Sequence, residues 1–138
     1  MRVVTVLMTT VLLAGCSVQG LKQTKPELKY GSQINFLDES FSANYQYLSK
    51  CWDENRQKNS YVGDSTVYSN VYTELNMAEM FVRLYNNQYA VLIEMKKKNE
   101  NETIVNAWGS SQFGIALVPQ WMGVLRECET KNIGLRYK

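Results

Sequence analysis

The side chains that could carry catalysis are few in this chain of 138 residues. The chain has no histidine, which excludes serine–histidine and cysteine–histidine nucleophile systems, histidine general bases and histidine-ligated metal sites. Serine hydrolases without histidine generally use a lysine base in a Ser-x-x-Lys motif, and no serine here has a lysine three residues later. The adjacent carboxylates Asp38-Glu39 and Asp53-Glu54 are typical of solvated helix surfaces, because neighbouring positions on a helix point in different directions. We therefore expect a protein that is not an enzyme.

Phosphate, metal and nucleic-acid sites are also poorly supported. Residues Gly109–Gly114 have the glycine spacing of a phosphate-binding loop, but Ile115 stands where such a loop needs lysine. We expect an ordinary strand-to-helix loop there. No carboxylates have the spacing of a calcium-binding loop, so we expect no metal and no cofactor. The net charge of +2 lacks the basic excess of nucleic-acid-binding domains, so we expect no nucleic-acid partner.

The N-terminus has the pattern of a secretory signal. Arg2 supplies a positive start, and residues 3–13 carry no charge but are too few to span a bilayer, which needs about 20 apolar residues. This apolar run ends in Leu13-Ala14-Gly15-Cys16, which resembles the lipobox of bacterial lipoproteins. In that family a diacylglycerol is attached to the cysteine thiol, the signal is cut just before the cysteine, and its new amino group is usually acylated, for example with palmitate.

The resemblance implies where the mature protein begins and where it lies. Residues 1–15 would be removed as the signal peptide, and Cys16 would carry the lipid. Each buried methylene contributes about 0.8 kcal/mol, so two or three acyl chains hold a protein stably on the bilayer. In lipoproteins of enteric Gram-negative bacteria, aspartate after the cysteine retains the protein at the inner membrane, whereas serine allows export. Ser17 therefore implies the periplasmic face of the outer membrane.

The segment after the lipobox lacks the marks of a packed element. Residues 16–32 are polar, include Pro26 and show no sustained period, which predicts a flexible tether that spans roughly 20–25 Å. Its lysines could contact anionic lipid, although a merely soluble linker is the simpler interpretation. We expect residues 33–138 to form a single globular domain.

Two amphipathic helices are predicted, one on each side of a central segment. The first is indicated by apolar side chains at spacings of 4, 3 and 4, namely Phe41, Tyr45, Leu48 and Trp52. We expect its N-cap at Asp38, Ser40 or Ser42. Pro119 suits the first turn of the second helix. The apolar stripe of this helix comprises Trp121, Leu125 and Cys128.

The two cysteines that remain after lipidation lie near the ends of these helices. With Cys16 assigned to the lipid, two cysteines remain, Cys51 and Cys128, and a pair of cysteines in an oxidising compartment favours a disulfide. Closing so long a loop is worth roughly 4–5 kcal/mol on the chain-entropy model. A pair of free thiols is the main alternative. A two-cysteine redox centre is less favoured because the chain lacks a Cys-x-x-Cys spacing.

Between the helices the hydrophobic period changes to two. This alternation predicts four strands, at about 67–75, 78–84, 89–95 and 103–108. Met77–Leu84 is ambiguous, because Asn76–Glu79 also fits a capping box, but the flanking strands and short loops favour a strand. The predicted fold is a two-layer α+β sandwich, in which a helix, a four-stranded antiparallel meander and a C-terminal helix follow one another and a disulfide bridges the helices.

Aromatic side chains are the best candidates for a partner surface. Tyrosine and tryptophan bury a large area with few rotatable bonds and keep a polar end, so they often anchor interfaces. We expect Tyr68 and Tyr72 on the outer face of the sheet, and Trp108 and Phe113 at a strand end and in the loop that follows. Packing in the core or across strands is the alternative for each ring.

The layout of signal, cysteine, tether, helix, strands and final helix resembles small proteobacterial lipoproteins of uncharacterised activity. The likeness is specific over residues 1–17 and architectural beyond them. It implies a non-enzymatic accessory or binding component of the envelope with a protein partner. One alternative is an inhibitor or exclusion factor against a lytic enzyme, a phage or conjugation, presented on a rigid loop at 109–114. The other alternative is a module that binds a lipid or a peptidoglycan fragment.

Overall fold

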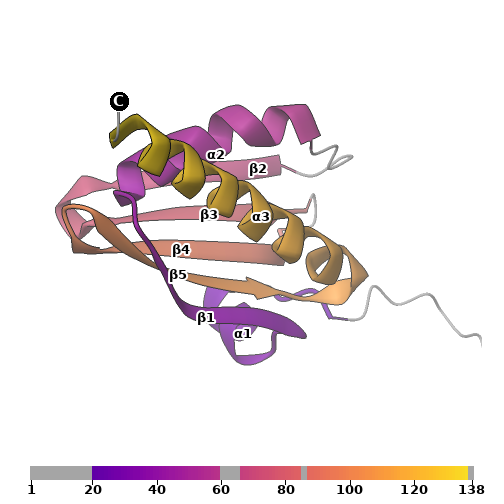
Figure 1. Ribbon diagram of the computed structural model, residues 1–138. Helices are drawn as coiled ribbons and strands as arrows, with labels where there is room; N and C mark the ends of the chain where they lie inside the picture. The colour runs from indigo at the N-terminus through magenta and orange to yellow at the C-terminus, as the bar shows by residue number, and fades with distance from the viewer. Residues whose placement is uncertain (1–19, 60–65, 85–86, 137–138) are drawn as a thin grey trace, which may run out of the picture.

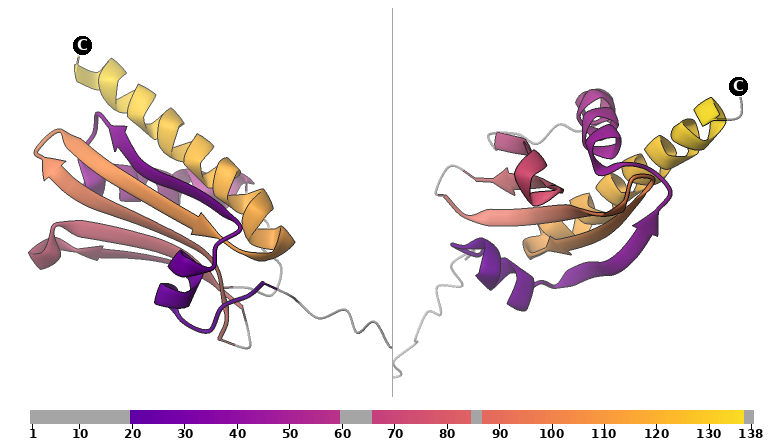
Figure 2. Two further views of the ribbon diagram at one scale, coloured as in Figure 1. Left: turned by 90° about the horizontal axis from the view of Figure 1, so that it is seen from below. Right: turned by 90° about the vertical axis from the view of Figure 1, so that its left-hand side faces the viewer.

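A computed structural model describes residues 20–59, 66–84 and 87–136, and it has the α+β architecture expected from the sequence (Figure 1). The elements in chain order are α1 (Lys25–Tyr30), β1 (Ile34–Phe41), α2 (Tyr45–Asn59), β2 (Thr66–Tyr72), the 3-10 turn η1 (Thr73–Leu75), β3 (Met77–Arg83), β4 (Tyr89–Asn99), β5 (Glu102–Gly109) and α3 (Ser111–Arg136). Within the described residues the strands form one antiparallel sheet in the order β1-β5-β4-β3-β2. Helices α2 and α3 cover one face, and α1 lies on the opposite face (Figure 2).

The predicted meander is confirmed, and it includes the ambiguous segment. Met77–Arg83 forms strand β3, which pairs along its length with both β2 and β4. All five residues inside β3 are buried, because helices cover this part of the sheet on both faces. A strand buried on both faces loses the alternation of apolar and polar residues, which explains why its sequence also suited a helix.

The strand β1, which pairs antiparallel with β5, is absent from the sequence-based prediction. The apolar stripe assigned to the first helix began at Phe41, but this residue ends β1, and the helix begins only at Tyr45. The pairing of β1 shifts register between Phe36 and Glu39, where Asp38 has a φ of 55°. This bulge interrupts the two-residue period, and an interrupted strand is difficult to recognise from its pattern.

The N-cap expected at Asp38, Ser40 or Ser42 is also wrong. The α2 helix is capped by Asn44, whose side-chain oxygen accepts a hydrogen bond from the backbone N–H of Gln46 at 2.8 Å. Asparagine is a preferred residue at helix N-termini because its short side chain reaches these free N–H groups.

Residues 20–32 are part of the folded body and are not the flexible tether expected from their sequence. Helix α1 begins with a capping box, in which Thr24 and Glu27 each bond the other's backbone N–H, and Pro26 occupies its first turn. Leu28 is completely buried. The folded body therefore includes residues 20–32 in addition to the domain expected from residue 33 onward.

Helix α3 begins eight residues earlier than predicted. Ser110 alone separates β5 from α3, and Pro119 lies inside the helix on its exposed side. The loop expected at 109–114 is therefore absent. Gly109 and Gly114 allow the helix to approach the strands: a Cβ at Gly114 would lie 2.4 Å from the carbonyl oxygen of Ala90. Their spacing reflects close packing, which is a common reason for glycine in a strand or helix.

The main core lies between the sheet and the two long helices. Trp52 of α2 and Trp121 of α3 meet edge to face at its centre, with ring centroids 4.6 Å apart, and both are fully buried. The predicted disulfide is confirmed: Cys51 and Cys128 join α2 to α3 across a Cα–Cα distance of 5.9 Å. The covalent bridge and the aromatic pair therefore hold the same two helices together.

Replacing Cys51 and Cys128 together by alanine should lower the free energy of unfolding by about 4 kcal/mol, because the bridge closes a sequence separation of 77 residues. Urea denaturation of the oxidised protein and of the double variant measures this difference. Thr130→Ala, which removes an exposed hydrogen bond within α3, is a control that should change stability by less than about 0.5 kcal/mol. A loss below about 1 kcal/mol in the double variant would contradict this account.

Candidate functional site on the outer face of the sheet

The outer face of the sheet, defined as the face opposite α2 and α3, carries a second and smaller core. Leu28 of α1 is inserted between Phe81, Leu92 and Trp108, which come from β3, β4 and β5. These side chains are at most 8% exposed. The one buried side chain of α1 therefore completes the packing of three central strands.

Two ion pairs fix α1 on either side of Leu28. Glu79 and Glu94 are direct cross-strand partners in β3 and β4, and they are only 8% and 5% exposed. Like charges directly opposite each other destabilise a sheet. Lys25 Nζ lies 2.6 Å from Glu79 Oε2, and Lys29 bonds Glu94. Helix α1 thus supplies the two positive charges that a pair of facing carboxylates requires.

The same lysines also contact aromatic rings. Lys25 Nζ lies 4.3 Å from the ring centroid of Phe81, and Lys29 Nζ lies 5.0 Å from that of Trp108. These are favourable cation–π distances. Both lysines are consequently committed to the sheet, and neither extends from a tether toward lipid.

Tyr68 and Tyr72, two of the four predicted surface residues, are brought together on the outer side of β2. They are 36% and 37% exposed. The Tyr68 ring stacks on Phe81 with centroids 4.8 Å apart, and the Tyr72 hydroxyl donates to Glu79 Oε2 at 3.4 Å. We call these two residues the β2 tyrosine pair. Each ring is held on one side and open on the other, as a preorganised contact surface requires.

The other two predicted surface residues lie elsewhere. Trp108 shares the outer face but is only 8% exposed, because Leu28 and Lys29 lie over it. Phe113 belongs to the first turn of α3 and packs, half-buried, against the main core on the opposite side of the sheet. Neither residue is on a protruding loop. Because Trp108 is covered by α1 and Phe113 lies on the opposite side of the sheet, neither joins the exposed surface of the β2 tyrosine pair.

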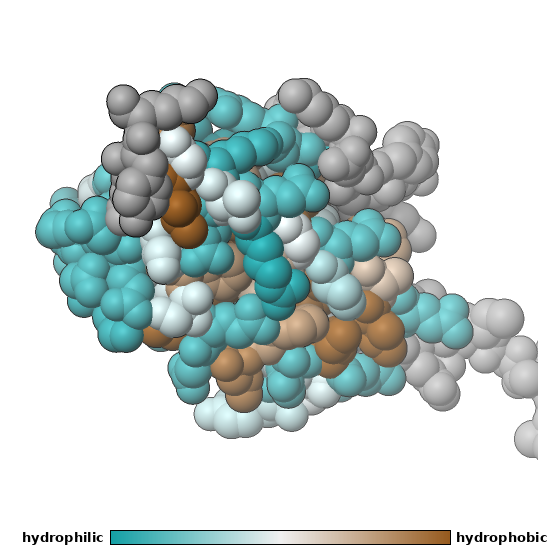
Figure 3. All heavy atoms as spheres, viewed as in Figure 1, coloured by the Kyte–Doolittle hydropathy of each residue, from teal (hydrophilic) through white to brown (hydrophobic). Residues whose placement is uncertain are grey.

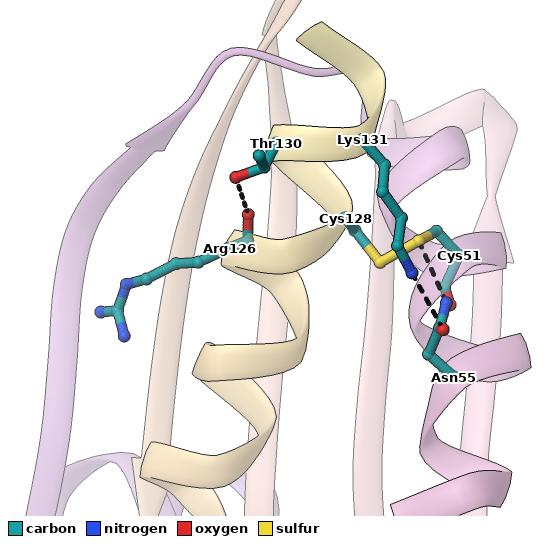
Figure 4. Close-up of a disulfide and its surroundings, with 6 residues drawn as sticks. All are labelled: Cys51, Asn55, Arg126, Cys128, Thr130 and Lys131. Carbon is teal, nitrogen blue, oxygen red and sulfur yellow. Dashed lines mark hydrogen bonds between the residues drawn. A yellow bond between two sulfur atoms is a disulfide. The ribbon is translucent and has the colours of Figure 1, made fainter. Parts of the chain in front are cut away.

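A groove of about 680 Å³ between α2 and α3 was not foreseen from the sequence. Its lining combines charged, polar and apolar side chains with Cys51, and the members are Tyr47, Lys50, Cys51, Glu54, Asn55, Lys131, Gly134 and Leu135. Lys131 Nζ donates to Asn55 Oδ1 at 3.2 Å, and Asn55 Nδ2 in turn donates to the carbonyl oxygen of Cys51 at 2.7 Å (Figure 4). The groove therefore has a hydrogen-bonded polar floor beside the disulfide. The helical spacing of Tyr47, Lys50 and Glu54 was the available sequence signal.

One carboxylate at the far end of the sheet has a perturbed acidity. Lys98 donates to Glu102 Oε1 at 2.6 Å, and the hydroxyl of Ser40 donates to the same oxygen. These hydrogen bonds stabilise the ionised form and hold the pKa of Glu102 below its usual value. The contact links the edge strand β1 to the β4–β5 hairpin and lies apart from the β2 tyrosine pair.

Comparison of the chain with protein-family models, with curated proteins and with solved structures finds no match. Among the described residues, no helix is long and apolar enough to cross a bilayer, and no three histidine, cysteine or acidic residues are grouped as metal ligands. The interpretation of the outer face and the groove therefore rests on their geometry.

Removing Lys29 should leave Glu94 buried without its main countercharge. We expect Lys29→Met to lower the free energy of unfolding by about 2 kcal/mol, measured by urea denaturation. Adding Glu94→Gln should recover most of this loss, because the facing carboxylates then no longer repel each other.

Lys96→Met provides the matched control for this prediction. Lys96 Nζ also approaches Glu94, at 3.8 Å, but its side chain is 58% exposed. Its loss should change stability by less than about 0.5 kcal/mol. Equal effects of the two lysine variants, or no recovery with Glu94→Gln, would count against the role assigned to α1.

Proposed function

We propose that the protein is a lipoprotein of the bacterial envelope, anchored through acylated Cys16 at the periplasmic face of the outer membrane. It acts there as a non-enzymatic accessory or binding component. The observation that carries this proposal is the uncharged run at residues 3–13 that leads directly into Leu13-Ala14-Gly15-Cys16. Ser17 supports export to the outer membrane.

The position of the folded body is compatible with a closely held anchor. Gly20, which belongs to the folded body, lies four positions after Cys16. Because an extended residue spans at most about 3.6 Å, Gly20 lies within about 14 Å of Cys16. The lipid would therefore hold the body near the membrane surface, a closer arrangement than a tether of sixteen residues would give.

The β2 tyrosine pair supports a protein partner. Tyr68 and Tyr72 are partly exposed on a rigid sheet, and Phe81 and Glu79 fix their rings. An interface formed there would lose little side-chain entropy, since the rings are already held.

A module that binds a lipid or glycan fragment is the second candidate function. The groove between α2 and α3 favours it, because Lys50, Glu54 and Lys131 offer hydrogen-bonding groups beside the apolar Leu135. The inhibitor alternative relied on a protruding loop at 109–114. Apart from Ser110, which links them, those residues belong to β5 and α3, so that support is lost.

Cys16→Ala should abolish acylation and release the protein from the membrane. The mass of the N-terminal peptide, together with fractionation of cell envelopes, measures both effects. Ser17→Thr keeps a small hydroxyl residue after the cysteine and should leave acylation intact. Unchanged membrane association of an unacylated Cys16→Ala protein would overturn the anchoring proposal.

The partner surface can be tested by placing a photo-crosslinking amino acid at Tyr68 or Tyr72 of the full-length protein in intact cells. We expect one dominant envelope protein to be captured from both positions, because their rings share one exposed surface. The product should disappear when Cys16→Ala removes the anchor. Mass spectrometry identifies the captured protein.

Tyr30 is the matched control position for this experiment. It is also a tyrosine and is 93% exposed, but it lies on α1 away from β2. The partner should be absent or strongly reduced from this position. Equal capture from Tyr30, or no product above background from either β2 position, would refute the role of the β2 tyrosine pair.

A further inference from the structure

Helix α3 is divided into an uncharged half and a charged half. Its first fifteen residues, Ser111–Leu125, contain no charged side chain. The remainder carries charges of both signs at Arg126, Glu127, Glu129, Lys131 and Arg136. The absence of charge extends to the exposed positions of the first half, which are Gln112, Ile115, Ala116, Pro119 and Gln120. Solubility alone would favour charges at such positions, so their absence requires another explanation.

The start of the uncharged half lies against Gly20, which is four positions after Cys16 in the sequence. A Cβ added at Gly20 would lie 3.0 Å from the backbone nitrogen of Ser111, the first residue of α3. This nitrogen donates to Gln33 Oε1 at 2.7 Å, and Lys22 pairs with Tyr89 beside it. The N-terminal segment is thus fixed against the start of α3, and hydrophobic residues gather near this end of the helix (Figure 3).

We propose that the exposed side of Ser111–Leu125 rests on the bilayer around the anchor, at the boundary between the headgroups and the acyl chains. The inference rests on the proposed function, because it requires an acylated Cys16. The chain from Cys16 to Gly20 covers four residue steps, so Gly20, which lies against the start of α3, is within about 14 Å of the lipidated residue. The anchor supplies a high effective concentration, so a weak contact is sufficient.

The charge pattern of α3 identifies lipid as the occupant of this surface. A charged side chain loses much more hydration free energy than an apolar or neutral polar one when its surface is pressed into the boundary of the acyl chains. A helix of 26 residues is about 39 Å long, so its charged end lies well away from the anchored end. The surface faces lipid at one end of the helix and water at the other.

Two isoleucines in α3 form a matched pair for the test. Ile115 is 41% exposed in the uncharged half, and Ile133 is 40% exposed in the charged half. They are separated by 18 positions along the same helix, or about 27 Å. Each isoleucine is replaced by cysteine in a separate variant. The new cysteine is labelled with an environment-sensitive fluorophore under non-reducing conditions, which keep the Cys51–Cys128 disulfide intact.

The measurement uses the full-length acylated protein on vesicles of phosphatidylethanolamine and phosphatidylglycerol, with and without brominated acyl chains. We expect the label at Ile115→Cys to shift its emission to the blue and to lose much of its intensity to the brominated lipid. The label at Ile133→Cys should show neither change. Cooperative unfolding of both labelled proteins verifies that they are folded.

The remaining outcomes separate the two proposals. If the protein is acylated and bound to vesicles but the label at Ile115→Cys is not quenched, the lipid contact is overturned and the proposed function is not. A blue shift without quenching belongs to this case, because it indicates that protein covers the label. Equal quenching at Ile133→Cys would overturn it as well. Protein without acyl mass that stays off the vesicles would overturn the proposed function and, with it, the lipid contact.

Discussion

The requirement to cover both faces of the central strands determines much of this structure. The interiors of β3 and β4 are buried on both sides, so helices on one face alone would leave an apolar strip in water. Helices α2 and α3 cover the first face. On the second face Leu28 fills the apolar strip, and its neighbouring lysines neutralise Glu79 and Glu94. A short helix of six residues, which would not be stable alone, is thereby fixed on the sheet.

Elements with an undisturbed hydrophobic period could be predicted from the sequence. These include β2, β4, β5, most of α2 and the C-terminal part of α3, whereas β3 was assigned from its flanking strands and short loops. The disulfide could be predicted because only Cys51 and Cys128 remain once Cys16 is assigned to the lipid. The bulge at Asp38 concealed β1, because it interrupts the two-residue period of the strand. Pro119 concealed the first two turns of α3, because proline is more often found in the first turn of a helix than in its interior. Helix α1 was missed although its capping box is visible at Thr24 and Glu27.

The candidate site was less predictable than the fold. Residue type identified Tyr68, Tyr72 and Trp108 as candidates, and all three do lie on the outer face. What separates them is cover by α1, which is distant in sequence from both β2 and β5. Exposure depends on such non-local packing, and a pattern within one segment carries no information about it. The groove between α2 and α3 has the same origin, because helices far apart in sequence form it.

The attachment of residues 20–33 also determines how mechanical load would pass through the protein. A pull on the chain before Gly20 acts on the contact of Gly20 with Ser111 and on the Lys22–Tyr89 bridge before it reaches the ion pairs of α1 and the edge strand β1. The hydrogen bond from Ser111 to Gln33 passes part of this load to α3, the helix that also carries Trp121 and Cys128. The N-terminal segment therefore distributes a pull over the sheet and α3 and does not concentrate it on a single contact.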